Sequence, residues 1–150
     1  MDEIAFEDAT AQADLVRRKE VSPTELVRGA IERIERLNPT LNAVIHPLFE
    51  QALATAKAPV PGPFSGVPFV VKDLGAECQG APLADGSRFA AGRYVSRADS
   101  ELVKRYKAAG LVILGKSNTS EFGLLPTTEP QFFGPTRNPW DTSRGPGGSS

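Results

Sequence analysis

Lys72 is the residue whose type and position most clearly indicate chemistry. It ends a run in which five of the six residues from Val67 to Lys72 are apolar. A short apolar run bounded by glycine and proline is typical of a buried strand, so Lys72 is expected where an interior or a cleft begins. A lysine that loses solvation gives up its proton more readily, and its neutral amine can act as a general base. The structural alternative is that Lys72 reaches solvent or pairs with Asp73, and spacing alone favours this alternative.

A second candidate is the segment Gly145-Pro146-Gly147-Gly148-Ser149-Ser150. Glycines allow unusual backbone geometry and the close approach of a substrate, and serine hydroxyls in such a loop can pass protons. Glycine–serine tracts are also common in linkers, so the segment alone decides little. A loop normally connects two elements, and we therefore expect the chain to continue beyond Ser150.

The remaining residue types offer little for metal or histidine chemistry. The sequence has one histidine, His46, and one cysteine, Cys78, so neither has a partner at metal-ligand spacing. We expect His46 to be a packed or surface residue and Cys78 to be an inert small residue. A serine–histidine hydrolase is also hard to build from one histidine beside Pro47. The sequence predicts no metal and no cofactor.

Residues 110–117 match the phosphate-loop pattern G-x-x-x-x-G-K-[ST] letter for letter. A phosphate loop follows a strand, opens a helix, and forms a cradle from the N–H groups of its middle residues. Here the middle residues, Leu111–Leu114, are themselves expected to form a strand, and a helix precedes them. Their N–H groups would be used in a sheet, so nucleotide binding is not predicted.

Charge and composition argue against several classes of protein. The formal net charge is −1, from 17 basic and 18 acidic residues, which argues against a general nucleic-acid-binding surface. No apolar run approaches the roughly 20 residues that span a bilayer, and the acidic N-terminus lacks the features of a secretory signal. A single cysteine fits a reducing compartment. We therefore expect a soluble cytoplasmic protein that binds neither membrane nor, directly, nucleic acid.

Periodicity and turn residues predict alternating helices and strands. Ser22, Pro23 and Glu25 form a capping box with proline at the first helical position, and Asn38-Pro39 is expected to end that helix. The segment Gly75–Ser96 has no clear period and is long enough to cover a site. The expected helices are Asp8–Lys19, Ser22–Leu37, Pro47–Lys57 and 99–109, with a short one in Gly115–Phe122, and the expected strands are Leu41–His46, Val67–Lys72 and Leu111–Leu114.

The strand that ends at Lys72, the helix at 99–109 and the strand at 111–114 form a βαβ-like unit. Such a unit indicates an α/β fold with parallel strands covered by helices. The length of the sequence suits one domain.

Four motifs resemble, in this order, the landmarks of the amidase signature family. They are Gly66-Val-Pro-Phe-Val-Val-Lys72-Asp73, Gly115-Lys116-Ser117-Asn118, Gly134-Pro135-Thr136-Arg137-Asn138-Pro139-Trp140 and Pro146-Gly-Gly-Ser149-Ser150. The resemblance covers almost the whole chain, and four ordered landmarks at similar spacing argue strongly against a chance match. It implies a central mixed β-sheet covered by helices on both faces. Residues 1–150 would be the N-terminal part of a single amidase signature domain.

The resemblance also implies a catalytic set of a lysine and two serines, one of them after a cis peptide bond. By motif position, Lys72 would be the base and Ser149 the bridging serine, which would also contact the substrate. Gly123 would lie where the backbone of family members touches the substrate. The nucleophilic serine would lie roughly two dozen residues beyond Ser149, near the backbone N–H groups of the oxyanion hole.

The implied activity is the hydrolysis of linear or cyclic carboxylic amides, acting on a small-molecule substrate through a serine acyl-enzyme. The segments Asp8–Ala13, Pro47–Glu50 and Thr127–Pro130 resemble stand-alone amidases that act on cyclic nylon-type oligomers. The run Thr127-Thr128-Glu129 and the segment Gly134–Trp140 also resemble the amidase component of the amidotransferase that forms Gln-tRNA or Asn-tRNA with partner chains. If the chain ends at Ser150, it lacks a nucleophile and would be a non-catalytic fragment. The acyl preference and the oligomeric state, a homodimer included, stay open.

Overall fold

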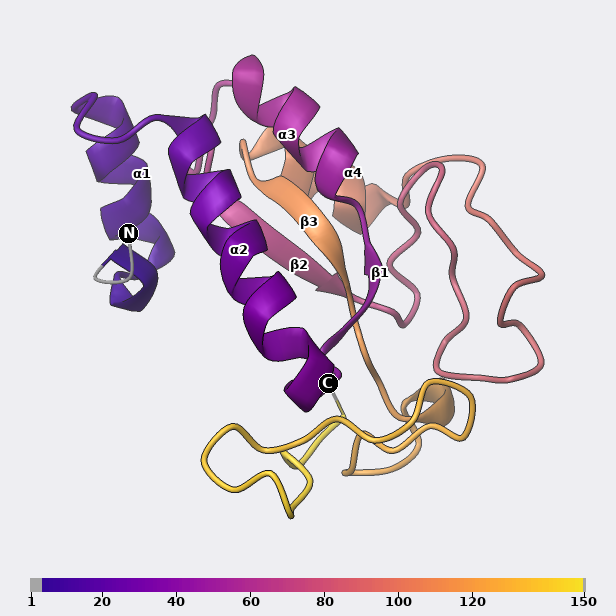
Figure 1. The fold of residues 1–150 in the computed structure, drawn as a ribbon. Helices are drawn as coiled ribbons and strands as arrows, with labels where there is room; N and C mark the ends of the chain where they lie inside the picture. The colour runs from indigo at the N-terminus through magenta and orange to yellow at the C-terminus, as the bar shows by residue number, and fades with distance from the viewer. Residues whose placement is uncertain (1–3, 150) are drawn as a thin grey trace.

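The structure, a computed structural model, describes residues 4–149. A mixed sheet of three strands lies at its centre, in the order β1–β3–β2, with helices on both faces (Figure 1). Strand β3 is parallel to β2 and antiparallel to β1. In chain order the elements are η1 (Ile4–Phe6), α1 (Ala9–Arg17), α2 (Pro23–Leu41), β1 (Val44–Pro47), α3 (Phe49–Lys57), β2 (Pro68–Lys72), α4 (Glu101–Ala108), β3 (Val112–Ser117) and η2 (Glu121–Gly123).

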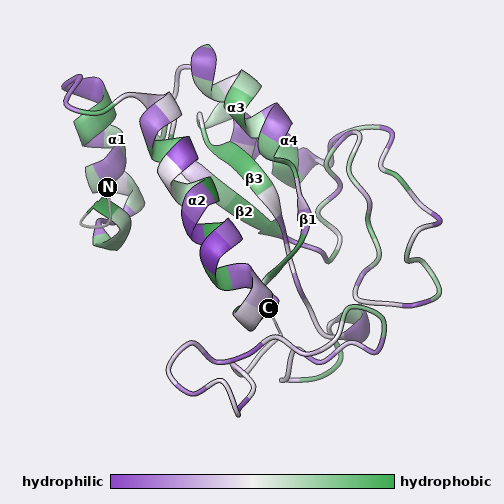
Figure 2. Cartoon of the chain, in the orientation of Figure 1, coloured by the Kyte–Doolittle hydropathy of each residue, from purple (hydrophilic) through white to green (hydrophobic). Residues whose placement is uncertain are grey.

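Two apolar clusters cover the two faces of the sheet. On one face, α2 and α3 pack onto Val112 and Leu114. On the other face, α4 and the segment around Cys78 pack onto Val71 and Ile113. Figure 1 shows α2 and α3 in front of the sheet and α4 behind it, and Figure 2 shows β2 and β3 as mostly hydrophobic. The predicted α/β fold, a mixed sheet covered by helices on both faces, is confirmed.

Strand β3 contains a β-bulge where it pairs with β2. Successive partners are Phe69↔Ile113, Val70↔Gly115 and Val71↔Lys116. Leu114 is therefore an extra residue in β3, and it shifts the alternation of the side chains by one position. As a result, Lys116 points to the same face of the sheet as Ile113.

Helix α2 begins as predicted but ends later. The Ser22 side chain accepts the N–H of Glu25, and the Glu25 carboxylate accepts the N–H of Ser22, which completes the predicted capping box. The prediction that Asn38-Pro39 ends the helix is wrong, because Pro39 lies inside its last turn. A proline at this position removes only one helical hydrogen bond. Asn42, in the left-handed conformation, closes the helix by donating its N–H to Asn38.

The expected strand Leu111–Leu114 is extended to Ser117 in β3. Its polar second half can remain in the sheet because the side chain of Lys116 is fully buried against an ion-pair partner. The strand expected at Leu41–His46 is observed slightly later, as β1. The segment Gly75–Ser96 has no regular element beyond an isolated bridge, as predicted. Within residues 4–149, no helix combines the length and the apolar character needed to cross a membrane.

Candidate active site

Lys72 and Ser149, 77 positions apart in the sequence, meet at the carboxyl end of β2. Lys72 is the last residue of this strand, and its Nζ atom lies 2.5 Å from the Oγ atom of Ser149. The peptide bond between Gly148 and Ser149 is cis. Ligands in α/β folds usually bind outside the carboxyl ends of the strands. The structure thus brings together two of the three members of the predicted catalytic set, and their roles stay predictions. Ser150 lies outside the described residues.

Two residues that follow β3 hold the main chain of Ser149. The Thr119 hydroxyl donates to the carbonyl oxygen of Ser149 at 2.9 Å, and the Ser120 N–H donates to the same oxygen at 3.2 Å. Both residues are buried, whereas Ser149 is half-buried. Gly148 is required beside them, because a Cβ atom there would lie 2.7 Å from the backbone of Thr127. The loop is thereby fixed to the end of β3.

Asp73 does not pair with Lys72, so the pairing considered from the sequence is wrong. Its Oδ1 atom instead lies 2.7 Å from the Nζ atom of Lys116, and both side chains are fully buried. The Oδ2 atom accepts the N–H of Ala84, and Lys116 also donates to the carbonyl oxygen of Pro82. The reason is the alternation of side chains, because Val71, Asp73 and Lys116 point to one face and Lys72 to the other. The carboxylate next to Lys72 is thus engaged by a different lysine.

The phosphate-loop pattern at residues 110–117 does not form a phosphate loop. Val112–Ser117 are strand β3, whose backbone groups pair with both neighbouring strands. Lys116 lies in the buried ion pair, not in a cradle of N–H groups. The structure agrees with the prediction made from the local pattern of helix and strand.

His46 and Cys78 are packed residues, as predicted. His46 lies opposite Lys116 in the β1–β3 pairing, and its ring meets the edge of Phe133 at a centroid distance of 5.3 Å. Burial lowers the pKa of His46, while the carboxylate of Asp73 opposes this shift and the ammonium of Lys116 adds to it. Cys78 is a buried free thiol, and burial raises its pKa. A raised pKa disfavours the thiolate that a nucleophile requires.

Gly123 ends the short turn η2 with a positive φ of 68°. Its N–H donates to the carbonyl oxygen of Ser120, so its own carbonyl oxygen is the backbone group that could meet a substrate. A Cβ atom at this position would lie 2.8 Å from Leu74, two residues after Lys72. Gly123 therefore belongs to the same end of the sheet as Ser149, and its contact with substrate stays a prediction.

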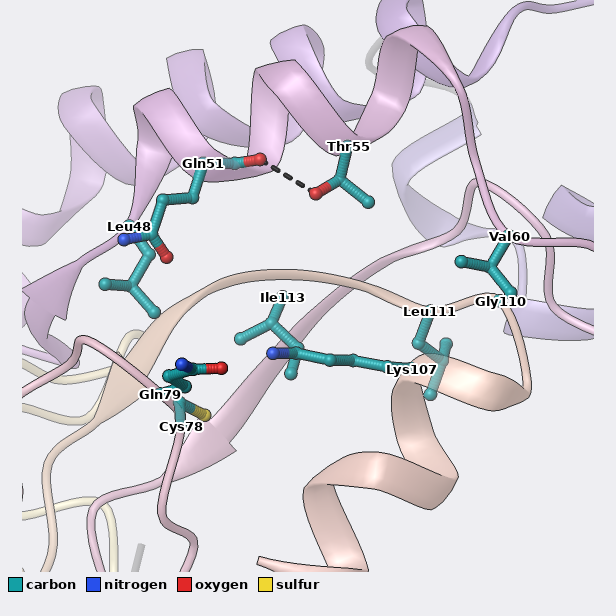
Figure 3. A pocket seen from close by; sticks show the side chains of 10 residues that line it. All are labelled: Leu48, Gln51, Thr55, Val60, Cys78, Gln79, Lys107, Gly110, Leu111 and Ile113. Atoms are coloured by element: carbon teal, nitrogen blue, oxygen red, sulfur yellow. Dashed lines mark hydrogen bonds between the residues drawn. The ribbon is translucent and has the colours of Figure 1, made fainter. Parts of the chain in front are cut away.

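A cavity of about 230 Å³ lies at the opposite end of β3, between α3 and α4 (Figure 3). Its apolar wall includes Leu48, Leu111 and Ile113. Its polar side chains include Gln51, Gln79 and Lys107. None of the residues that line this cavity belongs to the predicted catalytic set.

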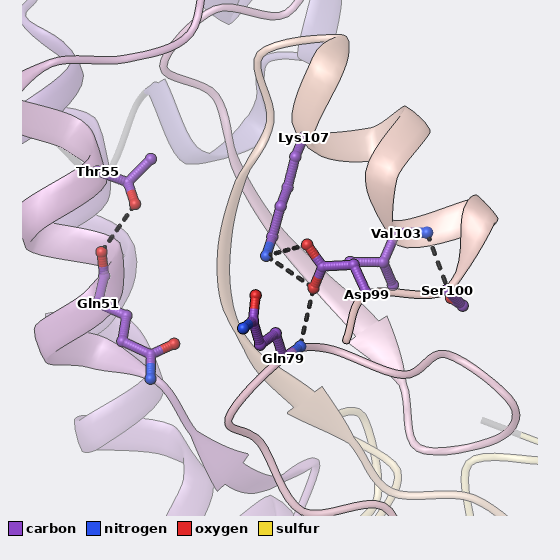
Figure 4. A network of polar contacts seen from close by, with 7 residues as sticks. All are labelled: Gln51, Thr55, Gln79, Asp99, Ser100, Val103 and Lys107. Carbon is purple, nitrogen blue, oxygen red and sulfur yellow. Dashed lines mark hydrogen bonds and ion pairs between the residues drawn. The ribbon is translucent and has the colours of Figure 1, made fainter. Parts of the chain in front are cut away.

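Beside this cavity, a second lysine–aspartate pair joins α4 to the preceding loop (Figure 4). The Nζ atom of Lys107 lies 2.7 Å from Oδ2 of Asp99, and Asp99 also accepts the N–H of Gln79. Burial acts against the ionised carboxylate, but the hydrogen bonds from Lys107 and Gln79 hold the pKa of Asp99 below its ordinary value. The side chains of Lys107 and Asp99 are 44% and 16% exposed, so water reaches this pair.

The contact between Lys72 and Ser149 is suited to proton transfer. A neutral amine at hydrogen-bond distance can accept the proton of a serine hydroxyl, and that serine can in turn accept a proton from a nucleophile. Among residues 4–149, no group of three or more His, Cys, Asp or Glu side chains is placed to hold a metal ion.

Sequence comparison identifies relatives of the whole chain. The profile of the Amidase family matches residues 25–150. The chain is 46% identical over 146 residues to 6-aminohexanoate-cyclic-dimer hydrolase of Paenarthrobacter ureafaciens, covering 97% of this chain and 29% of that protein. It is 39% identical over 158 residues to one of the subunits of glutamyl-tRNA(Gln) amidotransferase from Mycobacterium bovis, covering 99% of this chain and 32% of that protein.

A solved structure shows the same fold. The structure of 6-aminohexanoate cyclic dimer hydrolase complexed with substrate matches with a TM-score of 0.91 and 46% identity, covering 95% of this chain and 30% of that one. The chain therefore belongs to the amidase signature family. It spans somewhat less than a third of the length of these relatives.

The sequence led to Lys72 and Ser149 but not to the residues that support them. Thr119 and Ser120 hold Ser149, and Lys116 engages Asp73. Lys116 lies in one of the four motifs, but the motif by itself assigns it no role. The available indication was the position of Lys116, one glycine after the apolar run Leu111–Leu114, where a cation needs a partner.

Proposed function

We propose that the full-length protein hydrolyses the C–N bond of linear or cyclic carboxylic amides through a serine acyl-enzyme. The observation that carries this proposal is the distance of 2.5 Å between Nζ of Lys72 and Oγ of Ser149. Membership of the amidase signature family supports it. Residues 1–150 would form the N-terminal part of one amidase signature domain, since they cover 29% of the hydrolase from Paenarthrobacter ureafaciens.

The proposed reaction uses a relay of two proton transfers. The neutral amine of Lys72 accepts the proton of the Ser149 hydroxyl, while Ser149 accepts the proton of a second serine later in the chain. The oxygen of that serine bonds to the amide carbonyl carbon, and backbone N–H groups stabilise the oxyanion. Collapse of the tetrahedral intermediate breaks the C–N bond, and the proton returns through Ser149 to the leaving amine. Water then hydrolyses the acyl-enzyme with the same relay.

A stand-alone hydrolase is the form of this activity that we favour. The identity of 46% to a cyclic-dimer hydrolase exceeds the 39% to a component of an amidotransferase. The carbonyl oxygen of Gly123 would accept a hydrogen bond from the substrate beside Ser149. The single buried cysteine is consistent with a reducing, cytoplasmic location.

The second candidate is the amidase component of a glutamine-dependent tRNA amidotransferase. It rests on the 39% identity to the relative from Mycobacterium bovis. Glutamine-dependent amidation of tRNA that requires partner chains would establish this candidate in place of the hydrolase. The mass of the full-length protein in solution distinguishes a monomer, a homodimer and a complex with other chains.

The test is turnover by the full-length protein with Lys72 replaced. The 6-aminohexanoate cyclic dimer is the probe, with hexanamide as a linear amide for comparison. Lys72→Ala should lower kcat by about 10²–10⁴-fold, the usual contribution of a general base, with little change in the melting temperature because Lys72 is only partly buried. Lys104→Ala, an exposed lysine of α4, is the control. Near-normal turnover of Lys72→Ala would contradict the assignment of Lys72 as the general base.

A further inference from the structure

The buried ion pair between Asp73 and Lys116 lies directly behind the contact between Lys72 and Ser149. Asp73 directly follows Lys72 in the chain. Lys116 lies three positions before Thr119, and Thr119 binds the main chain of Ser149. The pair is 2.7 Å apart and both side chains are fully buried. One contact thus joins the end of β2, which carries Lys72, to the end of β3, which leads to the residue that binds Ser149.

The β-bulge at Leu114 makes this contact geometrically possible. Without the extra residue, the side chain of Lys116 would point to the face of the sheet that carries Lys72. With it, Lys116 points to the face where Asp73 lies. Bulges next to active sites often re-aim a side chain in this way.

The surroundings of the pair leave it few other arrangements. The second oxygen of Asp73 accepts the N–H of Ala84, and the Nζ atom of Lys116 donates to the carbonyl oxygen of Pro82. The N–H of Asp73 donates to the carbonyl oxygen of Ser117. Because these groups are shielded from water, a displacement of either strand would leave a charged or polar group without a partner.

We propose that Asp73 and Lys116 are positioning residues for the relay between Lys72 and Ser149. This proposal rests on the proposed function. Their pair sets the separation of the Lys72 amine and the Ser149 hydroxyl by fixing the end of β2 to the end of β3. It also engages the carboxylate next to Lys72.

The experiment compares three variants of the full-length protein with a matched control. They are Lys116→Met, Asp73→Asn and the double variant Asp73→Asn/Lys116→Met. The control is Lys107→Met, which removes a lysine from an ion pair of the same 2.7 Å length at the other end of β3. For each, kcat and KM for the 6-aminohexanoate cyclic dimer are measured together with the melting temperature.

Lys116→Met should lower kcat about 100-fold, the effect of a misplacement of about 1 Å, with KM within about threefold of the wild type. The double variant leaves no lone buried charge, so its melting temperature should return toward the wild-type value while its kcat stays at least about tenfold lower. Lys107→Met should keep kcat within about twofold. The recovery of stability without recovery of kcat is the result that a purely structural role would not give.

A folded variant that lacks the pair and has wild-type kcat overturns the proposal. Loss of folding in all three variants also overturns it. The pair would then be required for the fold as a whole and would have no separate role in positioning the Lys72 amine. Failure of the proposed function is recognised separately, since the wild-type protein would then hydrolyse neither the cyclic dimer nor hexanamide.

Discussion

The two lysine–aspartate pairs have the same length and very different surroundings. Asp73–Lys116 and Asp99–Lys107 both have a closest N–O distance of 2.7 Å. The first pair is fully buried at the end of the sheet that carries Lys72. The second is partly exposed at the opposite end, beside the cavity between α3 and α4. Burial, and not distance, distinguishes them.

The difference in burial explains how one end of the sheet can be held more firmly than the other. When an exposed pair loses one partner, water hydrates the other, so the net effect is small. When a buried pair loses one partner, the remaining charge has no water to replace it. The Lys72 end therefore has few alternative arrangements, whereas the cavity end tolerates change.

The largest expected effect is on the free energy of unfolding after loss of one lysine. Lys116→Met should lower it by about 3–5 kcal/mol, because it leaves the Asp73 carboxylate buried and unpaired. Lys107→Met should lower it by less than about 1 kcal/mol. Urea denaturation of the full-length variants measures both values. Equal losses would remove the distinction between the two ends.

Two threonine hydroxyl groups, one buried near Ser149 and one exposed on α3, allow the same comparison of buried and exposed contacts. Thr119→Val removes a fully buried donor to the Ser149 carbonyl oxygen and should cost about 1–2 kcal/mol of unfolding free energy. Thr55→Val, the matched control, removes an exposed hydroxyl that donates to the carbonyl oxygen of Gln51. Its effect should be within about 0.5 kcal/mol. Denaturation curves of both variants test this, and an equal effect at Thr55 would contradict it.

His46, beside the buried pair, adds a dependence on pH. Because burial lowers its pKa in the folded protein, the unfolded chain binds the proton more readily. Stability is therefore complete above the ordinary value of 6.5 and is lost as the pH falls below it. We expect a loss of roughly 1 kcal/mol or less between about pH 7.5 and about pH 5.5. His46→Gln should flatten this part of the curve; an unchanged slope would rule out His46 as its source.

The smallest expected effect belongs to Asp99 and Lys107. The coupling energy of Asp99→Asn and Lys107→Met in a double-mutant cycle should be about 0.5–1 kcal/mol near neutral pH. The pKa of Asp99 is lowered in the folded state, so this stabilisation is present above the unfolded value and disappears as the pH falls through the lowered one. A coupling energy that persists in acid would show that the contact does not depend on the carboxylate charge.

The sequence predicted much of the fold because its elements carry local signals. The capping box at Ser22 and the apolar run before Lys72 were sufficient for α2 and β2. The end of α2 was wrong because one missing hydrogen bond at Pro39 is tolerated in a last turn. The extension of β3 depends on a partner for Lys116 that lies far away in the sequence, at Asp73, and no local pattern reports it.

The candidate site divides in the same way. Lys72 and Ser149 could be found because they lie in motifs that resemble a known family. The β-bulge at Leu114 and the hydroxyl contact of Thr119 could not, because each depends on how separate segments pair in space. Local sequence therefore indicated the proposed reacting groups, and the tertiary structure was needed to find the residues that contact and hold them.

The most direct test of the relay is a double-mutant cycle on Lys72 and Ser149 in the full-length protein, read out as kcat for the 6-aminohexanoate cyclic dimer. If the two act as one unit, Lys72→Ala/Ser149→Ala should be within about threefold of the slower single variant, because removing either residue already breaks the relay. A loss equal to the product of the two single losses would show that Lys72 and Ser149 act independently, and would contradict the account.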